Sequence, residues 1–461
     1  MINRLLVINA VGLTRKLLGP HTPELNAIAA KHKRDLVPPL PAVTTTVQAT
    51  LLTGTSPEEH GIVANGWYFK DTAKVMLWQQ SNSLVHGDKL WDRIKRLRPG
   101  FRTAKMFWWY NMYSTAEFSV TPRPLYRSDG RKMPGSYAFP ATLNDELEAK
   151  LGKFPLFKFW GPLTDITSTR WIADSTIHVM DQYQPELVLT YLPHLDYNLQ
   201  RLGPKQDFDG PKAPGIAFDV MELDAEIGKL RACAARHGYE VMVLSEYGIQ
   251  EVSRPVHINR YLREKGLLKV RIECGEDWFD AGASDAFAVA DHQLAHVYVK
   301  DPSLVVSLAE ELAKLPGVAR AIHGDDRSSL GLKHERSGEI ILLSDRDAWF
   351  TYYYWLDDAK APDYARTVDI HQKPGYDPVE LFLVPGGKAK AGWTLLKRKF
   401  GLRALLDVIP LDANLVKGSH GVPTIDPADG PCLLSTVPLG EPWPLKMQDW
   451  AGMVEKMMTE G

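Results

Sequence analysis

Three consecutive threonines, Thr44, Thr45 and Thr46, are the side chains of this sequence best placed to do covalent chemistry. We expect a helix to begin at Thr44. The positive end of a helix dipole favours both an alkoxide and a bound phosphate. A hydroxyl in this position would therefore be favoured as a nucleophile beside a bound phosphate. The alternative is a threonine that only caps an ordinary buried helix.

Polar residues also follow three apolar runs that are predicted to be buried strands. These runs are residues 5–8, 187–192 and 241–244. Asn9 follows the first run, and polar clusters at residues 194–200 and 245–248 follow the other two. In open α/β sheets, ligands bind beyond the carboxyl ends of the strands. The three polar clusters therefore predict one shared site.

The threonine run is part of a longer string, in which Thr44 stands nine residues before a Thr-Gly pair at 53–54 and is followed by His-Gly-Ile at 60–62 and by Asn65. This string resembles the alkaline phosphatase superfamily, in its nucleotide pyrophosphatase/phosphodiesterase branch. The resemblance implies that Thr44 is the catalytic nucleophile and that Asn65 donates to a phosphoryl oxygen. Matching elements continue to His420, so the resemblance covers nearly the whole chain.

Members of this superfamily normally hold two zinc ions with an Asp after the first strand, an Asp-x-x-x-His, a Ser-Asp-His-Gly and a late Gly-x-His-Gly. The late motif is intact here, and the other three are altered. An amide, Asn9, replaces the first Asp, Gln200 replaces a His, and Glu246-Tyr247 replaces Asp-His. The positions that the resemblance marks as metal ligands are Asn9, Asp196, Gln200, Glu246 and His420.

This altered donor set predicts a different metal content. Zinc favours imidazole and thiolate, whereas amide and carboxylate oxygens suit Mg²⁺, Mn²⁺ or Ca²⁺. We therefore expect one divalent cation at most, and not two zinc ions. Missing ligands could return from histidines elsewhere in the chain, namely His194, His257, His292, His296 and His371. The best placed is His257, which follows the Glu246 strand end within a short loop. For each of these histidines, a hydrogen-bonded structural role is the simpler interpretation.

Four residues are expected to contact the substrate: Tyr247, Trp67, His257 and His371. The indole of Trp67, close after Asn65, would lie near the leaving group, and His371 belongs to a polar string that either binds phosphate or sugar hydroxyls or forms a salt-bridged turn. Aromatic clusters at residues 107–113 and 349–355 either stack on the substrate or pack between subdomains.

The segment 388–403 holds six basic residues and no acidic one, interleaved with Trp393 and Phe400. Such a segment is typical of peripheral contact with an anionic membrane. A solvated surface helix is the simpler interpretation.

The order of the predicted elements indicates an α/β fold, an alkaline-phosphatase-like, mainly parallel sheet flanked by helices, with a smaller α+β subdomain. We expect the core in residues 1–296, the smaller subdomain with the basic segment in 297–400, and a return to the core in 401–461, which carries the Gly-Ser-His-Gly motif and a C-terminal tail.

The composition of the 461 residues excludes several classes of protein. With 44% hydrophobic and 24% charged residues the chain is globular, and a net charge of −2 gives no sign of a nucleic-acid partner. Three distant cysteines exclude a disulfide scaffold. No apolar run is long enough to cross a membrane, and no signal peptide is evident, so a cytoplasmic protein is predicted.

Two functions remain open at this point. In the first, the protein is a hydrolase that acts on a phosphate ester or pyrophosphate through Thr44, or a transferase or lyase that handles a phosphate ester. In the second, it is a catalytically silent relative that binds a phosphorylated small molecule or a partner, as the altered ligand positions suggest.

Overall fold

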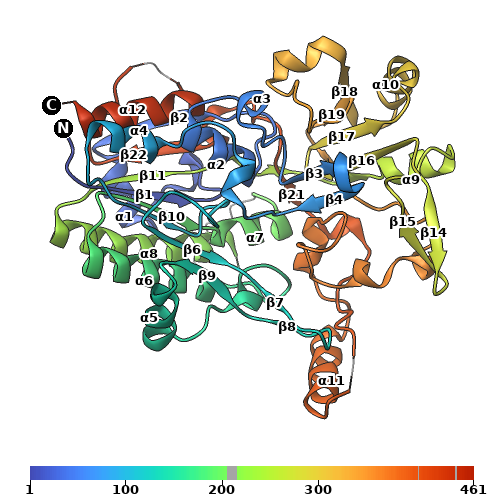
Figure 1. The fold of residues 1–461 in the computed structure, drawn as a ribbon, viewed down its shortest axis with the longest axis horizontal. Coiled ribbons are helices and arrows are strands. Elements are labelled where there is room, and N and C mark those ends of the chain that lie inside the picture. Colours follow the sequence, from blue (N-terminus) through green and yellow to red (C-terminus); the bar gives the residue numbers. More distant parts are fainter. Residues whose placement is uncertain (205–214, 403, 442–443, 461) are drawn as a thin grey trace.

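The fold is built around a nine-stranded mixed sheet (Figure 1). The computed structural model describes residues 1–204, 215–402, 404–441 and 444–460. In spatial order the strands of this sheet are β23 (Leu445–Lys446), β2 (His32–Val37), β22 (Cys432–Ser435), β11 (Glu240–Leu244), β1 (Leu5–Ala10), β10 (Leu187–Leu192), β5 (Thr103–Met106), β6 (Phe118–Pro122) and β9 (Ser136–Phe139).

The five central strands, from β11 to β6, run parallel, whereas β22 and β9 pair antiparallel at their sides. Strands β1 and β10 are buried along their whole length, because helices cover both faces of the sheet. This is why their sequences are continuous apolar runs and do not alternate. The predicted α/β architecture with a mainly parallel sheet is confirmed, and the three predicted strands correspond to β1, β10 and β11.

Helices form a layer on each face of this sheet (Figure 1). One layer contains α2 (Thr44–Thr53), α4 (Leu90–Leu97) and α12 (Met447–Thr459). The other contains α1 (Pro23–Ala29), α5 (Thr142–Leu151), α6 (Ile166–Tyr183), α7 (His194–Leu202) and α8 (Ile216–His237). All ten residues of α2 are buried, so this helix lies inside the protein and not on its surface.

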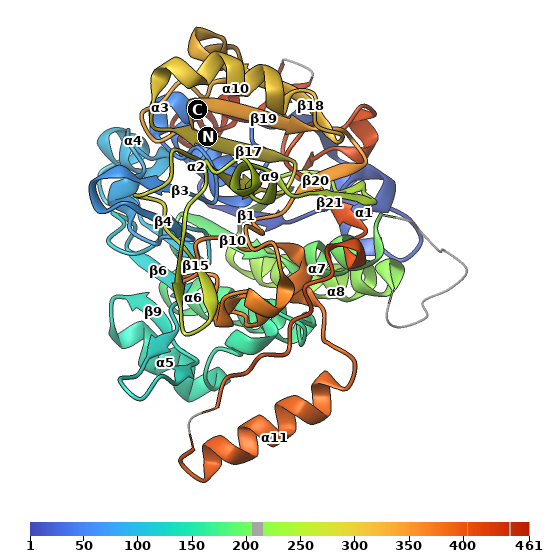
Figure 2. The same cartoon turned by 90° about the vertical axis from the view of Figure 1, so that its right-hand side faces the viewer.

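A smaller antiparallel sheet of four strands packs beside the main one (Figure 2). Its order is β16 (Ala286–Asp291), β17 (Leu294–Val299), β19 (Ile340–Ser344) and β18 (Val318–His323), with α10 (Val305–Leu312) against β18. The expected start of the subdomain at residue 297 falls inside β17, because β16 pairs with β17 along six residues and belongs to the same sheet. The four-stranded sheet itself begins at Ala286.

Short elements complete the chain. They are α3 (Pro57–His60), α9 (Ile258–Glu264), and the strand pairs β3 (Gly66–Phe69) with β4 (Lys74–Leu77), β7 (Leu125–Tyr126) with β8 (Lys132–Met133), β12 (Gln250–Glu251) with β21 (Gly418–Ser419), β13 (Arg254–Val256) with β20 (Ala348–Phe350), and β14 (Val270–Glu273) with β15 (Glu276–Phe279). Helix α11 (Gly387–Lys399) projects from the body of the molecule and contains most of the basic segment (Figures 1 and 2). Within the described residues, none of the helices has the length and apolarity that a membrane span requires.

Candidate active site

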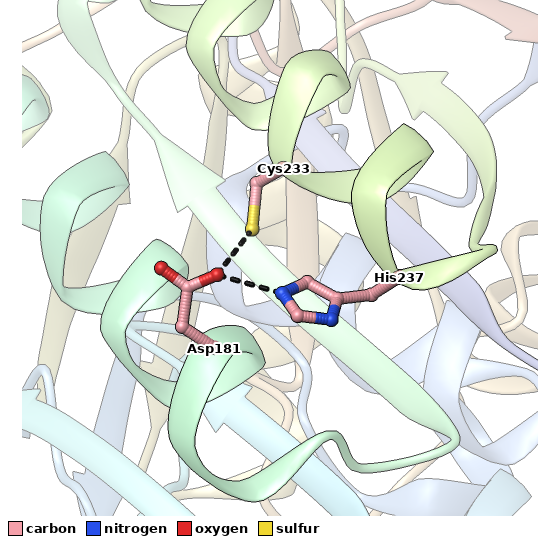
Figure 3. A group of neighbouring side chains, drawn as sticks. All are labelled: Asp181, Cys233 and His237. Carbon is pink, nitrogen blue, oxygen red and sulfur yellow. Dashed lines mark hydrogen bonds and ion pairs between the residues drawn. The ribbon is translucent and has the colours of Figure 1, made fainter.

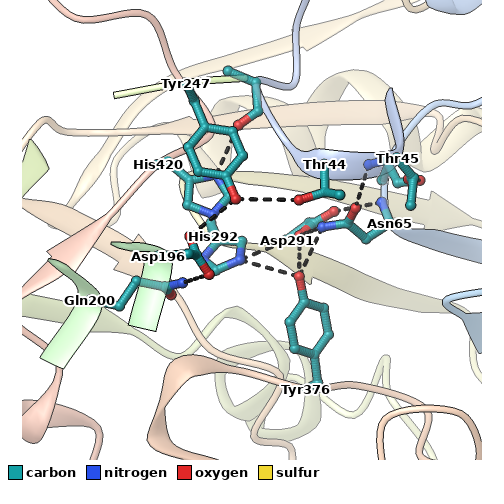
Figure 4. A network of polar contacts seen from close by, with 12 residues as sticks. Thr44, Thr45, Asn65, Asp196, Gln200, Tyr247, Asp291, His292, Tyr376 and His420 are labelled. Carbon is teal, nitrogen blue, oxygen red and sulfur yellow. Dashed lines mark hydrogen bonds and ion pairs between the residues drawn. The ribbon is translucent and has the colours of Figure 1, made fainter. Parts of the chain in front are cut away.

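The candidate site lies where β1, β10 and β11 end, facing the beginning of α2 (Figure 4). Because these strands are parallel neighbours, their carboxyl ends meet at one edge of the sheet. Strand β1 supplies Asn9, α7 follows β10 and supplies Asp196, and Glu246 follows β11. Each of these three side chains is at most 7% exposed.

Thr44 is the first residue of α2, and its hydroxyl faces the cavity. The residue before it, Val43, has no side chain that could cap the helix, and the backbone N–H of Thr45 donates instead to Oδ1 of Asn65 at 3.0 Å. The Oγ1 atom of Thr44 lies 3.3 Å from the hydroxyl of Tyr247. That hydroxyl donates to Oδ1 of Asp196 at 3.1 Å, which leaves its oxygen to accept from Thr44.

Asp196 and Gln200 lie one turn apart on α7, so both project toward the cavity. The Gln200 amide donates to Oδ2 of Asp196 at 2.6 Å. Burial raises the pKa of Asp196 to about 7, although the hydrogen bonds from Tyr247 and Gln200 oppose this shift. A carboxyl group that titrates near neutral pH is suited to proton transfer.

Glu246 is fully buried behind the cavity, next to Asn9. Its Oε1 atom accepts hydrogen bonds from the amides of Asn9 at 2.6 Å and Gln48 at 2.7 Å. Burial raises the pKa of Glu246 to about 8. The other carboxyl oxygen, Oε2, and the amide oxygen Oδ1 of Asn9 are both buried, and neither has a hydrogen-bond partner among the described residues.

Three rings lie against one another at one wall of the cavity (Figure 4). The Tyr247 ring lies parallel to His420 with 3.6 Å between centroids, and His292 lies 3.9 Å from His420 on centroids. The Nδ1 atom of His420 bonds the carbonyl of Ala42 at 2.8 Å and must donate, so Nε2 carries the lone pair. Burial lowers the pKa of His420 to about 3, so this ring is neutral at physiological pH.

His292 holds a backbone φ of 58°, in the left-handed region that residues other than glycine rarely adopt. Trp78, on another side of the same cavity, has a φ of 56°. Such conformations cost about 1–3 kcal/mol each, and they cluster where a structure must hold a functional group in place. Both residues line the cavity, so this cost falls at the site.

Asn65 connects the threonine helix to the smaller sheet. Its Oδ1 accepts from the Thr45 amide at 3.0 Å, while its backbone N–H and side-chain amide both donate to Asp291, at 2.7 and 3.1 Å. The same side-chain amide donates to the Tyr376 hydroxyl at 2.9 Å. A bond from Asn65 to a phosphoryl oxygen therefore requires the exchange of one of these partners.

The cavity provides about 40 Å³ for the centres of water-sized molecules. This is room for about three waters, and so for a group of the size of phosphate. Its polar lining consists of Thr44, Asn65, Asp196, Gln200, Tyr247, His292, Tyr376 and His420. Its aromatic lining consists of Trp78, Trp109, Phe159, Trp160, Tyr191 and Tyr197.

Three of the residues expected to contact substrate do not line this cavity. His257 bonds Thr351 at 2.7 Å, and Trp67 packs beneath the guanidinium of Arg336. His371 lies behind the wall, with its ring centroid 6.3 Å from that of Trp109.

The two aromatic clusters also differ in their surroundings. From the first cluster Trp109 lines the cavity, whereas residues 349–355 are buried in the core and are absent from the lining. Sequence reasoning missed Asp291, Tyr376 and Gln48, because no motif or local pattern connects them to the threonine helix. It ranked His292 below His257, although a polar histidine directly after an apolar run was a usable signal.

Two buried oxygens beside the cavity could hold a cation. They are Oδ1 of Asn9 and Oε2 of Glu246, which lack hydrogen-bond partners among the described residues and are donors of the kind that Mg²⁺, Mn²⁺ or Ca²⁺ accepts. On the other side of Tyr247, both oxygens of Asp196 already accept hydrogen bonds from protein groups. The cavity lining itself contains two imidazoles, those of His292 and His420, and one carboxylate, that of Asp196.

Comparisons with known proteins agree with this architecture. The chain is 26% identical over 246 residues to an uncharacterized pyrophosphatase/phosphodiesterase of Schizosaccharomyces pombe. That match covers 50% of this chain and 41% of the yeast protein, so the chain spans less than half of this relative's length.

Two solved structures share the fold over nearly the whole chain. Murine ectonucleotide pyrophosphatase/phosphodiesterase 5 aligns with a TM-score of 0.58 at 14% identity, over 99% of this chain and 95% of that one. Phosphonoacetate hydrolase from Sinorhizobium meliloti, in complex with phosphonoacetate, aligns with a TM-score of 0.60 at 12% identity, over the same fractions.

A sequence model of the type I phosphodiesterase/nucleotide pyrophosphatase family matches residues 5–377. This range contains every residue of the cavity lining except His420, and it covers most of the chain. The chain therefore belongs to the type I phosphodiesterase/nucleotide pyrophosphatase family.

Proposed function

We propose that this protein hydrolyses a phosphodiester or pyrophosphate bond and that Thr44 is the nucleophile. The observation that carries the proposal is the continuous hydrogen-bonded path from the Thr44 hydroxyl through Tyr247 to Asp196. This path ends on a carboxyl group whose pKa burial raises to about 7. It begins at the start of a buried helix, where a phosphate group is favoured.

In this reaction the Oγ1 atom of Thr44 bonds to phosphorus as the bond to the leaving oxygen breaks. The Thr44 proton passes to the Tyr247 oxygen, and the Tyr247 proton passes to Asp196. The leaving oxygen takes a proton from solvent. The oxygen of a water molecule then bonds to phosphorus as the bond to Thr44 breaks. The proton on Asp196 returns through Tyr247 to the Thr44 oxygen, and the water releases a proton to solvent.

A divalent cation, when bound by Asn9 and Glu246, supplies positive charge near the reacting phosphate. Mg²⁺, Mn²⁺ and Ca²⁺ suit these oxygen donors. For its part, Gln48 donates to Oε1 of Glu246 and so leaves Oε2 available to the cation. His420 is held neutral and presents Nε2 as an acceptor.

The proposed substrate is a small phosphorylated molecule with a flat or apolar substituent. The cavity accepts a group of the size of phosphate, and indole rings of Trp78, Trp109 and Trp160 surround it. Aromatic walls of this kind stack on planar or apolar groups. A crystal structure of the murine relative contains AMP, which is consistent with a nucleotide-like ligand.

The decisive experiment compares Thr44→Ala with Thr46→Ala in the hydrolysis of bis(4-nitrophenyl) phosphate. Protein is stripped with chelator and supplied with Mg²⁺, Mn²⁺, Ca²⁺ or Zn²⁺ in turn. We expect Thr44→Ala to lose several powers of ten in rate. We expect Thr46→Ala to retain activity, because its hydroxyl has no hydrogen-bond partner among the described residues.

The other outcome identifies a binding protein. If wild type turns over no phosphodiester with any of the four ions, the hydrolase proposal is wrong. In that case the silent-relative hypothesis predicts that AMP still binds, which equilibrium dialysis with wild type and Thr44→Ala measures.

We further propose that α11 and the residues after it contact an anionic membrane surface. The segment 381–406 contains no Asp or Glu. Trp393 is 60% exposed and Phe400 76% exposed, and Lys397 and Lys399 lie between them. Exposed aromatic groups beside basic ones favour the headgroup region of acidic lipids. Arg403, which we counted in the basic segment, lies outside the described residues.

Co-sedimentation with lipid vesicles tests this contact. We expect binding to vesicles that contain phosphatidylserine, weak binding to pure phosphatidylcholine, and release by salt. The variant W393A/F400A should lose the binding, whereas Ile272→Ala, which removes an exposed apolar side chain elsewhere, should not. Equal binding by W393A/F400A and wild type would contradict the proposal.

A further inference from the structure

His194 is a buried histidine at the contact between α7 and α8. It is the first residue of α7, and its side chain is 4% exposed. Neither ring nitrogen makes a hydrogen bond within the described residues. Buried polar groups are nearly always hydrogen-bonded, so an imidazole that makes no hydrogen bond with the described residues requires an explanation.

Two carboxylates of α8 surround this ring. The Nε2 atom of His194 lies 3.5 Å from Oδ1 of Asp219 and 3.5 Å from Oε2 of Glu222. One ligand atom from each of the three residues lies within 4.8 Å of the others. In α8 the two carboxylates are three residues apart, so they project from one face of the helix.

The two distances from the Nε2 atom of His194 are close to those between ligands of a shared metal ion. Two ligands of a tetrahedral zinc ion, each at about 2.0–2.1 Å from it, lie roughly 3.3–3.4 Å apart. Good N–H···O hydrogen bonds measure about 2.7–3.2 Å. The observed distances are longer than such bonds and close to the separation that a common ion imposes.

Neighbouring groups hold the carboxylate of Asp219 in this orientation. The Asn198 amide donates to Oδ2 of Asp219 at 2.7 Å and leaves Oδ1 to face His194. Arg201 in turn donates to the amide oxygen of Asn198 at 2.8 Å. Outer hydrogen bonds of this kind are what orient the ligands of bound metals. The side chain of Glu222 is 22% exposed, which provides a route of entry from solvent.

The other candidate group of this kind in the described residues is satisfied without an ion (Figure 3). There, His237 bonds Oδ1 of Asp181 at 2.7 Å, and Arg236 reaches the same oxygen at 3.1 Å. The thiol of Cys233 also points to this oxygen. A hydrogen-bonded carboxylate beside a guanidinium does not need a cation, so this group serves as a comparison.

We propose that His194, Asp219 and Glu222 bind a divalent transition metal, with zinc as the best match to one imidazole and two carboxylates. A water molecule completes the coordination. The site is separate from the cavity of Thr44, because none of the three residues belongs to the lining of that cavity. The ion joins α7, which carries Asp196 and Gln200, to α8.

Calorimetric titration with zinc chloride alone tests the site on the full chain after removal of metal by chelator. We expect wild type to bind one more zinc ion per chain than Glu222→Gln, and saturating zinc to raise the Tm of wild type by about 2–5 °C more than that of the variant. Asp219→Asn should behave like Glu222→Gln. Asp181→Asn, in the comparison group, should bind as wild type does.

Equal zinc stoichiometry in wild type and Glu222→Gln would overturn the proposal. The proposal would also be overturned if Asp181→Asn, and not Glu222→Gln, bound one zinc ion fewer than wild type. If Glu222→Gln lowers the Tm of metal-free protein while zinc leaves wild type unchanged, the three residues form an ion triad and no metal site. None of these readouts depends on phosphodiester hydrolysis, so the site is tested independently of the proposed activity.

Discussion

The three neighbouring threonines have the same hydroxyl group but three different environments. Thr44 reaches Tyr247, Thr45 donates to the carbonyl of Ala64 at 3.0 Å, and Thr46 has no partner among the described residues. The Oγ1 atom that could attack phosphorus is therefore distinguished by its position alone. Tyr247 is the residue that gives it a path to a base.

Tyr247→Phe tests this path, because it removes the hydroxyl and leaves the ring stacked on His420. We expect kcat for phosphodiester hydrolysis to fall by about 10²–10⁴-fold with little change in KM. Tyr197→Phe is the matched control, since its hydroxyl belongs to a residue of the cavity lining and has no partner among the described residues. An unchanged kcat in Tyr247→Phe would exclude the proton path.

Glu246 makes the stability of the protein depend on pH. Its pKa is about 8 in the folded protein and roughly 4.3 in an unfolded chain. Between these values the folded state holds a proton that the unfolded state has lost. The contribution to the free energy of unfolding is therefore complete below pH of about 4 and is lost as the pH rises through 8, by at most about 1.4 kcal/mol per pH unit.

In Glu246→Gln, the free energy of unfolding should decrease less steeply with pH, because an amide does not titrate and still offers an acceptor to Asn9 and Gln48. Urea unfolding of chelator-treated protein between about pH 5 and 8 measures this pH dependence. Glu339→Gln, a substitution nearer the surface, should leave the wild-type slope unchanged. Parallel slopes for Glu246→Gln and wild type would show that Glu246 is ionised throughout.

At the scale of elements, the segment that follows β11 has no room for an added side chain at Gly248. A Cβ atom on Gly248, two residues after Glu246, would lie 1.7 Å from the carbonyl oxygen of Asp429. Gly452, in α12, has open space around the same position. The two glycines therefore form a matched pair for substitution by alanine.

We expect Gly248→Ala to lower the free energy of unfolding by about 1–3 kcal/mol and to impair the site, because the strand end must move. Gly452→Ala should raise it by about 0.5–1 kcal/mol, since alanine is the better helix former. Urea midpoints at constant m-value measure both effects. A stable, active Gly248→Ala would mean that the strand end is free to shift.

The central strands could be predicted from the sequence because full burial on both faces makes them continuous apolar runs, as in β10. The order of motifs along the chain also predicted that Thr44, Asp196 and His420 lie together. Asp291 could not be predicted, since its place beside Asn65 results from the packing of β16 against the hairpin of β3 and β4. The same packing makes β16, which begins at Ala286, the first strand of the smaller sheet in sequence order.

At the scale of the whole molecule, Asp291 connects the smaller sheet to the candidate active site. Its carboxylate, on the smaller sheet, accepts three hydrogen bonds from Asn65 and Tyr376, at 2.7–3.1 Å. The smaller sheet is therefore part of the structure that positions the residues of the cavity. Its removal should not leave an active core.

Asp291→Asn tests this connection with a minimal change of shape. An amide cannot accept on both sides, so Asn65 should lose its orientation and the hydrolytic rate should fall by about 10- to 100-fold. Asp224→Asn is the control, because that buried carboxylate accepts from the backbone of α1 and lies outside the cavity lining. Asp224→Asn should lower the stability of the protein and leave the hydrolytic rate unchanged. Equal rates in the two variants would mean that the smaller sheet does not support the site.

The exposed indole of Trp393 has an optical consequence. Among the tryptophans in the described part of the chain, Trp393 is exposed, while the others are buried or half-buried. In a Trp443→Phe background, which removes the tryptophan outside the described residues, acrylamide should quench mainly the fluorescence of Trp393. The projecting helix thus carries its own reporter, and a loss of quenching would signal, without any attached label, that its surface has become covered.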